Sequence, residues 1–403
     1  MQTISFMRGL AQLASDGTLG VTEVVEGMHR DIAGFGAAPD LWHSTLSGFI
    51  YDLVRGGMSL SGKTLGVALG VADRWLPTQG NAAAENLLDD LASALNGAFG
   101  DHLEESGNPL AIRMQLRIRG GEIEPEPTAL AKTFARSSGR LLLFAHGLCL
   151  DERCWNTAEG VDFAAALAGH HGYDCVFLRY NSGRHVSTNG RELAVLLDRL
   201  LAAWPAPIEE FSIIAHSMGG LLTRSACHYA RQAGLGWTRC LRTAMYLGTP
   251  HHGSPVEKLG QYTTLGLSWA PYGRALSLLG KARSAGVKDM RHGNLLDEDW
   301  QGSDQDTNIG DRRHPVPLFP GVRHCMAAAT LEQGAKVNPA KRMVGDMLVR
   351  VQSAMGVHAD AARSLEVPAA QRRVFMGMNH FDLLRHPDVY AQVERWLVGM
   401  TDA

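Results

Sequence analysis

The segment from Phe211 to Arg224 constrains the fold of this chain more than any other part of the sequence. Its first residues, Phe-Ser-Ile-Ile-Ala, form an apolar run with the length and β-branched content of a buried strand. From Leu221 a helical pattern begins, and Ser217 stands between the two with Gly219 after it. A strand and a helix joined by so sharp a turn strain the residue at the apex, so its neighbours must be small. The segment therefore predicts a nucleophile elbow around Ser217. Ala215 stands where the usual pattern has Gly, and a variant elbow tolerates its methyl group.

Two further segments supply what such an elbow needs. The run from Arg140 to Ala145 is typical of a buried strand, and it ends in His146-Gly147. The run from Val374 to Met378 is typical of a last strand, and it leads to His380 and a closing helix from Pro387 to Val398. A His in the loop between the last strand and the last helix can reach back to the elbow. We therefore expect His380 to be the general base.

Together these segments resemble the bacterial triacylglycerol lipases and esterases of the α/β-hydrolase superfamily, small bacterial lipases most of all. The resemblance covers about residues 138 to 400 and fits loosely between residues 251 and 320. It is carried, in chain order, by His146-Gly147, Ala215 to Gly220, Gly345 to Val349 and His380 to Leu384. It implies an α/β-hydrolase fold and the chain order Ser, acid, His. It also implies an oxyanion hole formed by the backbone amides of Leu148 and Met218.

The acid has the most alternatives. The candidates between Ser217 and His380 are Asp289, Asp297, Asp299, Asp304, Asp306, Asp311, Asp346 and Asp360. Asp346 is favoured because Gly-Asp-Met-Leu-Val resembles the acid-bearing turn of small lipases. The Asp residues from 289 to 311 lie in an inserted region, where acids more often solvate a surface. The 17 residues from 329 to 345 separate Asp346 from the preceding strand, and a relative normally reaches the acid sooner.

The chain divides into a helical first part and an alternating second part. Residues 1–105 are predicted to be an N-terminal helical extension, because apolar residues recur at helical spacing in Val21 to Ile32 and Ala82 to Phe99. Residues 106–403 alternate strands and helices, which predicts a mostly parallel sheet covered on both faces. The expected strands lie at 110–118 and near 140–146, 174–179, 211–216, 243–248, 322–328 and 373–378. The expected helices lie near 159–169, 189–203 and 218–233, and residues 122–127 are expected to be extended or loop.

Residues 251–320 separate two core strands by far more than a normal connection. They begin near the carboxyl ends of the strands, where such sheets bind ligands. Leu265 to Leu279 contributes aliphatic and aromatic side chains. We therefore expect this insertion to be a lid with an apolar underside above Ser217.

Residues 57–64 match the P-loop pattern G-x-x-x-x-G-K-[ST]. A P-loop needs a buried strand before it and a partner strand that ends in Asp. No convincing strand of the second kind follows, so we interpret the match as chance. The alternative is a nucleotide-binding regulatory module in the helical extension.

Composition and charge limit the partners, location and cofactors that this chain can have. A net charge of −3 gives no electrostatic case for nucleic acid or an anionic membrane surface as a partner. No apolar run approaches the ~18 residues of a transmembrane helix. The first 20 residues lack the apolar core of a secretory signal, and several of the six scattered Cys lie inside predicted strands or helices, where a free Cys behaves as a small hydrophobe. We therefore expect a reduced, cytoplasmic protein. The Cys also lack zinc-site spacing. His251 and His252 have no acid at ligand spacing, so we predict no metal and no cofactor. The oligomeric state stays open.

The sequence thus predicts a serine carboxylic-ester hydrolase, an esterase or lipase, that acts on apolar acyl esters through Ser217, Asp346 and His380. Its partner would be a small-molecule or lipid ester. An acyltransferase or thioesterase with the same triad is the alternative within enzymes. A catalytically silent protein of the same fold, used for binding, is the alternative outside them.

Overall fold

The computed structural model describes residues 82–119, 121–156, 160–254, 284–302, 311–332 and 345–399, with six positions between 5 and 13. It divides the chain into two compact units, residues 1–112 with 257–284 and residues 113–256 with 285–403. In the first unit, helix α5 spans Ala82–Glu105 and is kinked at Phe99, where φ is −137° and ψ is 17°. The helix predicted from Ala82 to Phe99 is therefore present and continues beyond the kink. The helix predicted at Val21 to Ile32 and the P-loop match lie outside the described residues.

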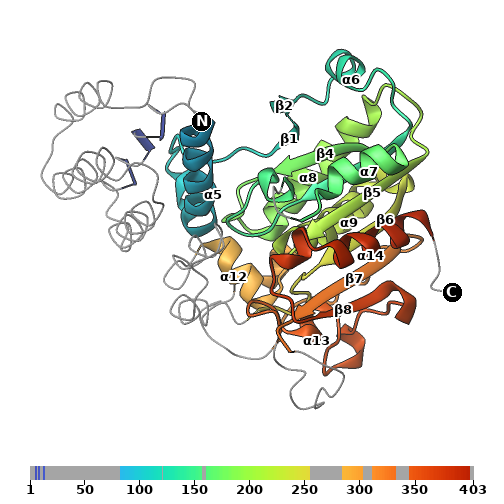
Figure 1. Cartoon of the computed structure of the whole chain (residues 1–403). Helices are drawn as coiled ribbons and strands as arrows, with labels where there is room; N and C mark the ends of the chain where they lie inside the picture. Colours follow the sequence, from blue (N-terminus) through green and yellow to red (C-terminus); the bar gives the residue numbers. More distant parts are fainter. Residues whose placement is uncertain are drawn as a thin grey trace, which may run out of the picture. The chain divides into compact units, whose positions relative to one another are not determined.

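The second unit is built on one eight-stranded sheet with the order β2-β1-β4-β3-β5-β6-β7-β8 (Figure 1). Strand β1 is antiparallel to both of its neighbours, and every pair from β4 to β8 is parallel. This mixed, mostly parallel sheet confirms the predicted α/β class. The strands are β1 Gln115–Ile118, β2 Gly121–Ile123, β3 Arg140–Ala145, β4 Asp174–Arg179, β5 Glu210–His216, β6 Leu241–Leu247, β7 Arg323–Thr330 and β8 Arg372–Met376.

The start of the sheet differs from the prediction. Only the last four residues of the strand expected at Leu110 to Ile118 enter the sheet. Asn96 of α5 explains the difference, since its side chain donates to the Leu110 carbonyl at 2.7 Å and accepts from the Ile112 amide at 2.9 Å. The backbone before β1 is thereby held to the helix. The first two residues of the stretch 122–127, expected to be extended or loop, belong to strand β2, which pairs with β1 as a hairpin.

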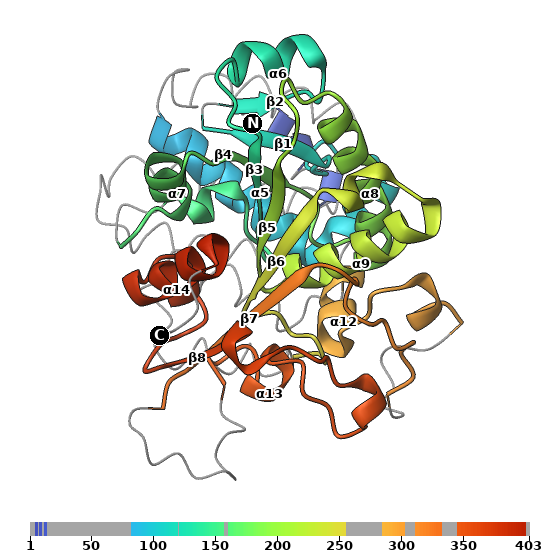
Figure 2. The same ribbon diagram turned by 90° about the vertical axis from the view of Figure 1, so that its right-hand side faces the viewer.

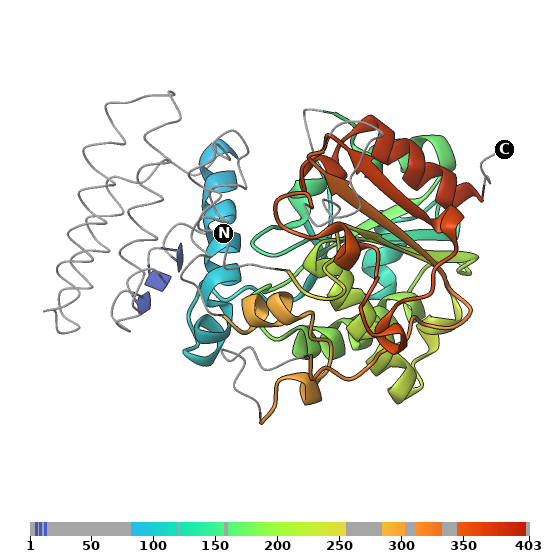
Figure 3. The ribbon, with the colours of Figure 1, turned by 90° about the horizontal axis from the view of Figure 1, so that it is seen from below.

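Helices cover both faces of the sheet. Helices α7 (Phe163–His171) and α14 (Pro387–Val398) lie on one face, and α8 (Val186–Ala202) and α9 (Met218–Ala233) lie on the other (Figure 2). Seen from below, α14 in red and α9 in yellow-green again lie on opposite sides of the strands (Figure 3). The other α-helices are α6 Pro127–Thr133, α12 Ala285–His292 and α13 Val351–Ala354. Short 3-10 turns are η1 Glu152–Trp155, η2 Gly236–Arg239, η7 Asp297–Asp299, η8 Ala361–Arg363, η9 Ala369–Gln371 and η10 Asp382–Leu384.

The core follows the two-residue period of the central strands. Leu141, Leu143 and Ala145 of β3 belong to the buried cluster that includes Leu193 of α8 and Leu222 of α9. Phe144 stacks on Phe177 at 5.2 Å and meets the edge of Trp155 at 5.1 Å. Apolar burial on both faces is what a parallel sheet between two helix layers requires.

None of the helices in the described part of the chain combines the length and the apolar character needed to cross a bilayer. All six cysteines have free thiols.

Candidate active site

Ser217 lies at the sharp turn between β5 and α9. Its φ of 53° and ψ of −123° are unusual for a residue with a side chain. Its amide donates to the Leu247 carbonyl of β6 at 2.9 Å, which ties the turn to the sheet. A Cβ on Gly219 would lie 2.6 Å from the carbonyl oxygens of both Ala145 and His146. The turn can therefore approach β3 this closely only with glycine at that position.

Asp346 and His380 form a buried pair. The Asp346 carboxylate accepts a hydrogen bond from His380 Nδ1 at 2.6 Å, and both side chains are at most 3% exposed. Its other oxygen accepts from the amides of Leu348 and Val349 at 3.0 and 2.8 Å. The His380 amide donates to the Asp346 carbonyl at 3.3 Å. These bonds hold the imidazole with its proton on Nδ1, which leaves Nε2 as the basic nitrogen.

The elbow and the loop of His380 meet through their neighbours. The rings of His216 and His380 have centroids 4.6 Å apart, and His216 Nε2 donates to the His380 carbonyl at 3.1 Å. A Cβ on Gly248, which follows Leu247, would lie 2.9 Å from His380 Cε1. Ser217, Asp346 and His380 are therefore gathered at the carboxyl end of the parallel strands.

His216, which precedes Ser217, has a different role from His380. Burial lowers the pKa of His216 well below its ordinary value, and the neighbouring His380 lowers it further. A neutral imidazole that donates to a backbone carbonyl positions the loop of His380 and does not take up protons. His216 is therefore a packed residue of the elbow that holds the loop of His380.

The turn after β3 lies directly against the elbow. A Cβ on Gly147 would lie 3.0 Å from Ser217 Cβ. His146 holds this turn: its ring stacks on Tyr180 at 4.4 Å, and its carbonyl accepts from the Tyr180 hydroxyl at 3.0 Å. Leu148 and Met218 are both buried. Within the described residues, neither of their amides has a hydrogen-bond partner, which leaves two donors beside Ser217.

Backbone strain occurs at the turns that carry Leu148, Ser217 and Asp346. In the described chain, positive φ at a non-glycine residue occurs at Cys149 (60°), Ser217 (53°) and Met347 (85°). Cys149 follows Leu148, and Met347 follows Asp346. Such conformations cluster at functional sites. The backbone thus points to the same turns as the side-chain chemistry.

A charged cluster behind the turn after β3 was not predicted from the sequence. Glu152 accepts from Arg117 at 2.9 Å and from Arg179 at 2.6 Å. Burial alone would raise the pKa of Asp151, but Arg153 and Arg179 outweigh it and the pKa lies below its ordinary value. The available signal was the run Asp151-Glu152-Arg153, which begins four residues after Gly147. The cluster anchors the chain just beyond Leu148.

The other candidate acids make contacts of their own. Asp289 accepts from His185 Nδ1 at 3.0 Å and from the Val186 amide at 2.8 Å. Asp311 pairs with Arg313 and with Arg363. Asp297 pairs with Arg191, Asp299 accepts from the amides of Leu295 and Leu296, and Asp360 accepts from the amide of Ala362. Asp304 and Asp306 lie outside the described residues.

The insertion at 251–320 is described in part. The Gly286 amide of α12 donates to the Gly183 carbonyl just before α8, at 2.9 Å. Ser225 of α9 donates to the Leu295 carbonyl at 2.7 Å. Leu265 to Leu279, the expected apolar underside, lies outside the described residues, so the lid stays a prediction. Among the residues that the structure describes, no three His, Cys, Asp or Glu side chains gather as metal ligands do.

The strand order, the elbow at the end of β5 and the Asp–His pair after β7 and β8 decide the architecture. The chain has an α/β-hydrolase fold. Neither a protein-family model nor a curated protein matches its sequence.

Solved structures of lipases and esterases resemble this α/β-hydrolase chain at low identity. The Bacillus licheniformis lipase BlEst2 in mature form is 20% identical over 65% of this chain and 92% of its own, with a TM-score of 0.42. The Pyrococcus furiosus esterase Pf2001 is 13% identical over 66% of this chain and 84% of its own, with a TM-score of 0.36. The carboxylesterase EstE1 from a metagenomic library is 12% identical over 72% of this chain and 88% of its own, with a TM-score of 0.39. At these values the fold assignment depends on the topology and the elbow.

Proposed function

We propose that this protein is a serine hydrolase of carboxylic esters, with Ser217 as nucleophile, His380 as general base and Asp346 as the acid that orients it. The observation that carries the proposal is the 2.6 Å hydrogen bond between buried Asp346 and His380 beside the strained turn of Ser217. A carboxylate that fixes the imidazole tautomer and a base beside a Ser are the parts that acyl transfer requires.

The reaction follows from these roles. His380 Nε2 takes the Ser217 proton as Oγ attacks the ester carbonyl. The amides of Leu148 and Met218 stabilise the negative oxygen of the tetrahedral intermediate, an effect worth about 10²- to 10³-fold in rate per donor. The intermediate collapses to an acyl-enzyme, and His380 protonates the departing alcohol. Water, deprotonated by His380, then releases the carboxylic acid and restores Ser217.

Esters with apolar acyl groups are the substrate class that we infer. The support is the aliphatic and aromatic composition of Leu265 to Leu279 in the proposed lid. The similar solved structures carry the names lipase, esterase and carboxylesterase. Six free thiols are also compatible with the reducing cytoplasmic location that we expect.

The test is hydrolysis of p-nitrophenyl esters of increasing chain length by the wild type and Ser217→Ala. We expect hydrolysis by the wild type alone, and labelling of Ser217 by a fluorophosphonate probe. Faster release of p-nitrophenol on adding an alcohol, with transfer of the acyl group to it, would indicate an acyltransferase. Preference for the matching thioester would indicate a thioesterase. A folded wild type that neither reacts with the probe nor turns over any ester would contradict the proposal.

A further inference from the structure

A second concave site lies apart from the residues of the proposed triad. It is a cavity of about 120 Å³ between α9, the turn after β6, and the segments around residues 293–299, 313–317 and 362–365. Since one water needs only about 10–15 Å³ by this kind of measure, the cavity has room for a small ion or molecule. It is far below the ~300 Å³ of an ordinary drug-sized site. None of Ser217, Asp346, His380, Leu148 and Met218 lines it.

The walls of this cavity carry more positive than negative charge. Arg224, Arg313 and Arg363 line it, together with Asp299. Asp311 lies behind the wall and pairs with both Arg313 and Arg363. The two oxygens of Asp299 are already engaged, one by the amides of Leu295 and Leu296 and the other by the amide of His314 at 2.7 Å. Neither Asp299 nor Asp311 forms an ion pair with Arg224, so Arg224 has no ion pair among the described residues.

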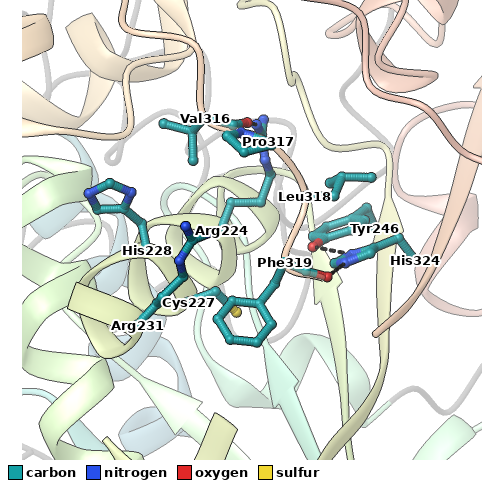
Figure 4. Close-up of a pocket in the computed structure, with 10 residues that line it drawn as sticks. All are labelled: Arg224, Cys227, His228, Arg231, Tyr246, Val316, Pro317, Leu318, Phe319 and His324. Carbon is teal, nitrogen blue, oxygen red and sulfur yellow. Dashed lines mark hydrogen bonds between the residues drawn. The ribbon is translucent and has the colours of Figure 1, made fainter. Parts of the chain in front are cut away.

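Arg224 is nearly fully buried, with 6% of its surface exposed. Its Nη2 donates to the Val316 carbonyl at 2.6 Å, and its Nη1 lies 3.3 Å from His251 Nδ1. Figure 4 shows Arg224 extending from α9 toward Val316 and Pro317, beside a smaller cavity of about 30 Å³ that shares this wall. Burial lowers the pKa of Arg224 to about 10, so the guanidinium stays charged at neutral pH. A buried cation without an anion is costly, which favours an anion as its complement.

One of the two neighbouring imidazoles, that of His251, adds a donor without a partner in the described chain. A guanidinium can only donate, so His251 Nδ1 accepts from Arg224 and the proton of His251 lies on Nε2. By the same argument His252, whose Nδ1 lies 3.3 Å from Arg313 Nη2, carries its proton on Nε2. Among the described residues, Arg224 Nε and His251 Nε2 have no hydrogen-bond partner, whereas the His252 ring is hydrogen-bonded to the Gly356 backbone. The wall of the cavity around Arg224 therefore contains two side-chain donors that lack an acceptor in the part of the chain that the structure describes.

We propose that this cavity binds a small oxyanion, a carboxylate or phosphoryl group, through Arg224 with His251 as an additional donor. The anion gives Arg224 the ion pair that it lacks among the described residues. It also connects α9 to the segments at 313–317 and 362–365 that close the cavity. Binding is therefore expected to stabilise the folded protein in proportion to the logarithm of the anion concentration.

The experiment is thermal unfolding of the full chain in sodium acetate, phosphate or sulfate, with sodium chloride at equal ionic strength as the reference. At a hundredfold excess over Kd we expect Tm to rise on the order of 5 °C for at least one oxyanion. A response to acetate alone identifies a carboxylate site, and a response to phosphate and sulfate identifies a phosphoryl site. Equal responses to chloride and to all three oxyanions would overturn the proposal.

The matched variants are Arg224→Met, which removes the cation and keeps an unbranched apolar stem, and Arg140→Met. Arg140 pairs with Glu210 away from the cavity, so its variant should keep the Tm response. Arg224→Met should abolish it, and an unchanged response would refute the role of Arg224. If Arg224→Met does not fold, crystals of the wild type grown with the anion that raised Tm show whether the anion binds at Arg224. Anion oxygens within hydrogen-bond distance of Arg224 are expected, and only water in the cavity would overturn the proposal. Either result leaves the proposed hydrolysis untouched, since Ser217 is assayed separately.

Discussion

The turn that carries Ser217 and the turn that carries Asp346 lie at the same end of the sheet but are held in different ways. The Ser217 turn is formed by contiguous residues, the end of β5, Gly219 and the first turn of α9, and Gly219 lets this segment approach the carbonyls of Ala145 and His146. The Asp346 turn closes on itself through hydrogen bonds from Leu348 and Val349 and reaches a partner 34 residues away. The first is a local feature that a short sequence segment specifies. The second depends on where distant parts of the chain come together.

The largest effect should come from the local feature. Ser217→Ala should lower kcat for ester hydrolysis by about 10⁴- to 10⁶-fold, because the members of a triad act as a unit. The fold should persist, since the side chain becomes smaller and β5 and α9 are unchanged. Steady-state kinetics with circular dichroism as the folding control measures both. Hydrolysis at the wild-type rate by correctly folded Ser217→Ala would remove Ser217 from the mechanism.

Substitutions in the Asp346–His380 pair should lower kcat nearly as much. Asp346→Asn should lower kcat by about 10⁴-fold, because an amide no longer fixes the productive imidazole tautomer. His380→Ala should lose most activity as well. Asp311→Asn is the matched control and should stay active, since Asp311 pairs with Arg313 and Arg363. Asp304→Asn should also stay active. If Asp311→Asn were inactive and Asp346→Asn active, the acid would be misassigned.

Acidification should lower the free energy of unfolding moderately, through His324 in β7. This strand precedes the Asp346 turn. Burial lowers the pKa of His324 from 6.5 to about 4, so this side chain is neutral in the folded protein. Between these values the unfolded chain binds a proton that the folded chain does not, so stability is lost as pH falls from 6.5 toward 4. The loss from His324 is at most about 3 kcal/mol. Urea unfolding of wild type and His324→Gln across this range should give a shallower pH dependence for the variant. Identical slopes would exclude His324 as a contributor.

The smallest effect tests the steric origin of the Ser217 turn. Gly219→Ala should destabilise the protein by about 1–3 kcal/mol, because the new Cβ would meet two backbone carbonyl oxygens that cannot move aside. Gly169 in α7 is the control, since a Cβ there meets nothing within 4 Å. Gly169→Ala should stabilise by up to ~1 kcal/mol. Chemical denaturation measures both, and equal effects of the two substitutions would contradict the steric argument.

The same distinction explains what the sequence could predict. The helix from Pro387 to Val398 matches its prediction at both ends, because Pro at its start and Gly399 after it are local signals. The strands from β3 to β8 also follow from apolar runs. The start of β1 was misplaced because Asn96 holds Leu110, and propensity carries no information about such a contact. The ion pairs of Glu152 were missed because Arg117 and Arg179 are 35 and 27 residues away in the chain.

In the described part of the chain, the three non-glycine residues with positive φ bear on how the stability of this protein can be raised. Each such conformation costs about 1–3 kcal/mol, while a whole domain is stable by only ~5–15 kcal/mol. Glycine at Cys149, Ser217 or Met347 would relax the backbone, yet Ser217→Gly would remove the proposed nucleophile. The strained turns around the proposed site thus make the protein less stable than the same fold would be without them. A more heat-resistant variant that keeps its activity is therefore better sought among residues such as Gly169 on the outer helices than at the turns around the site.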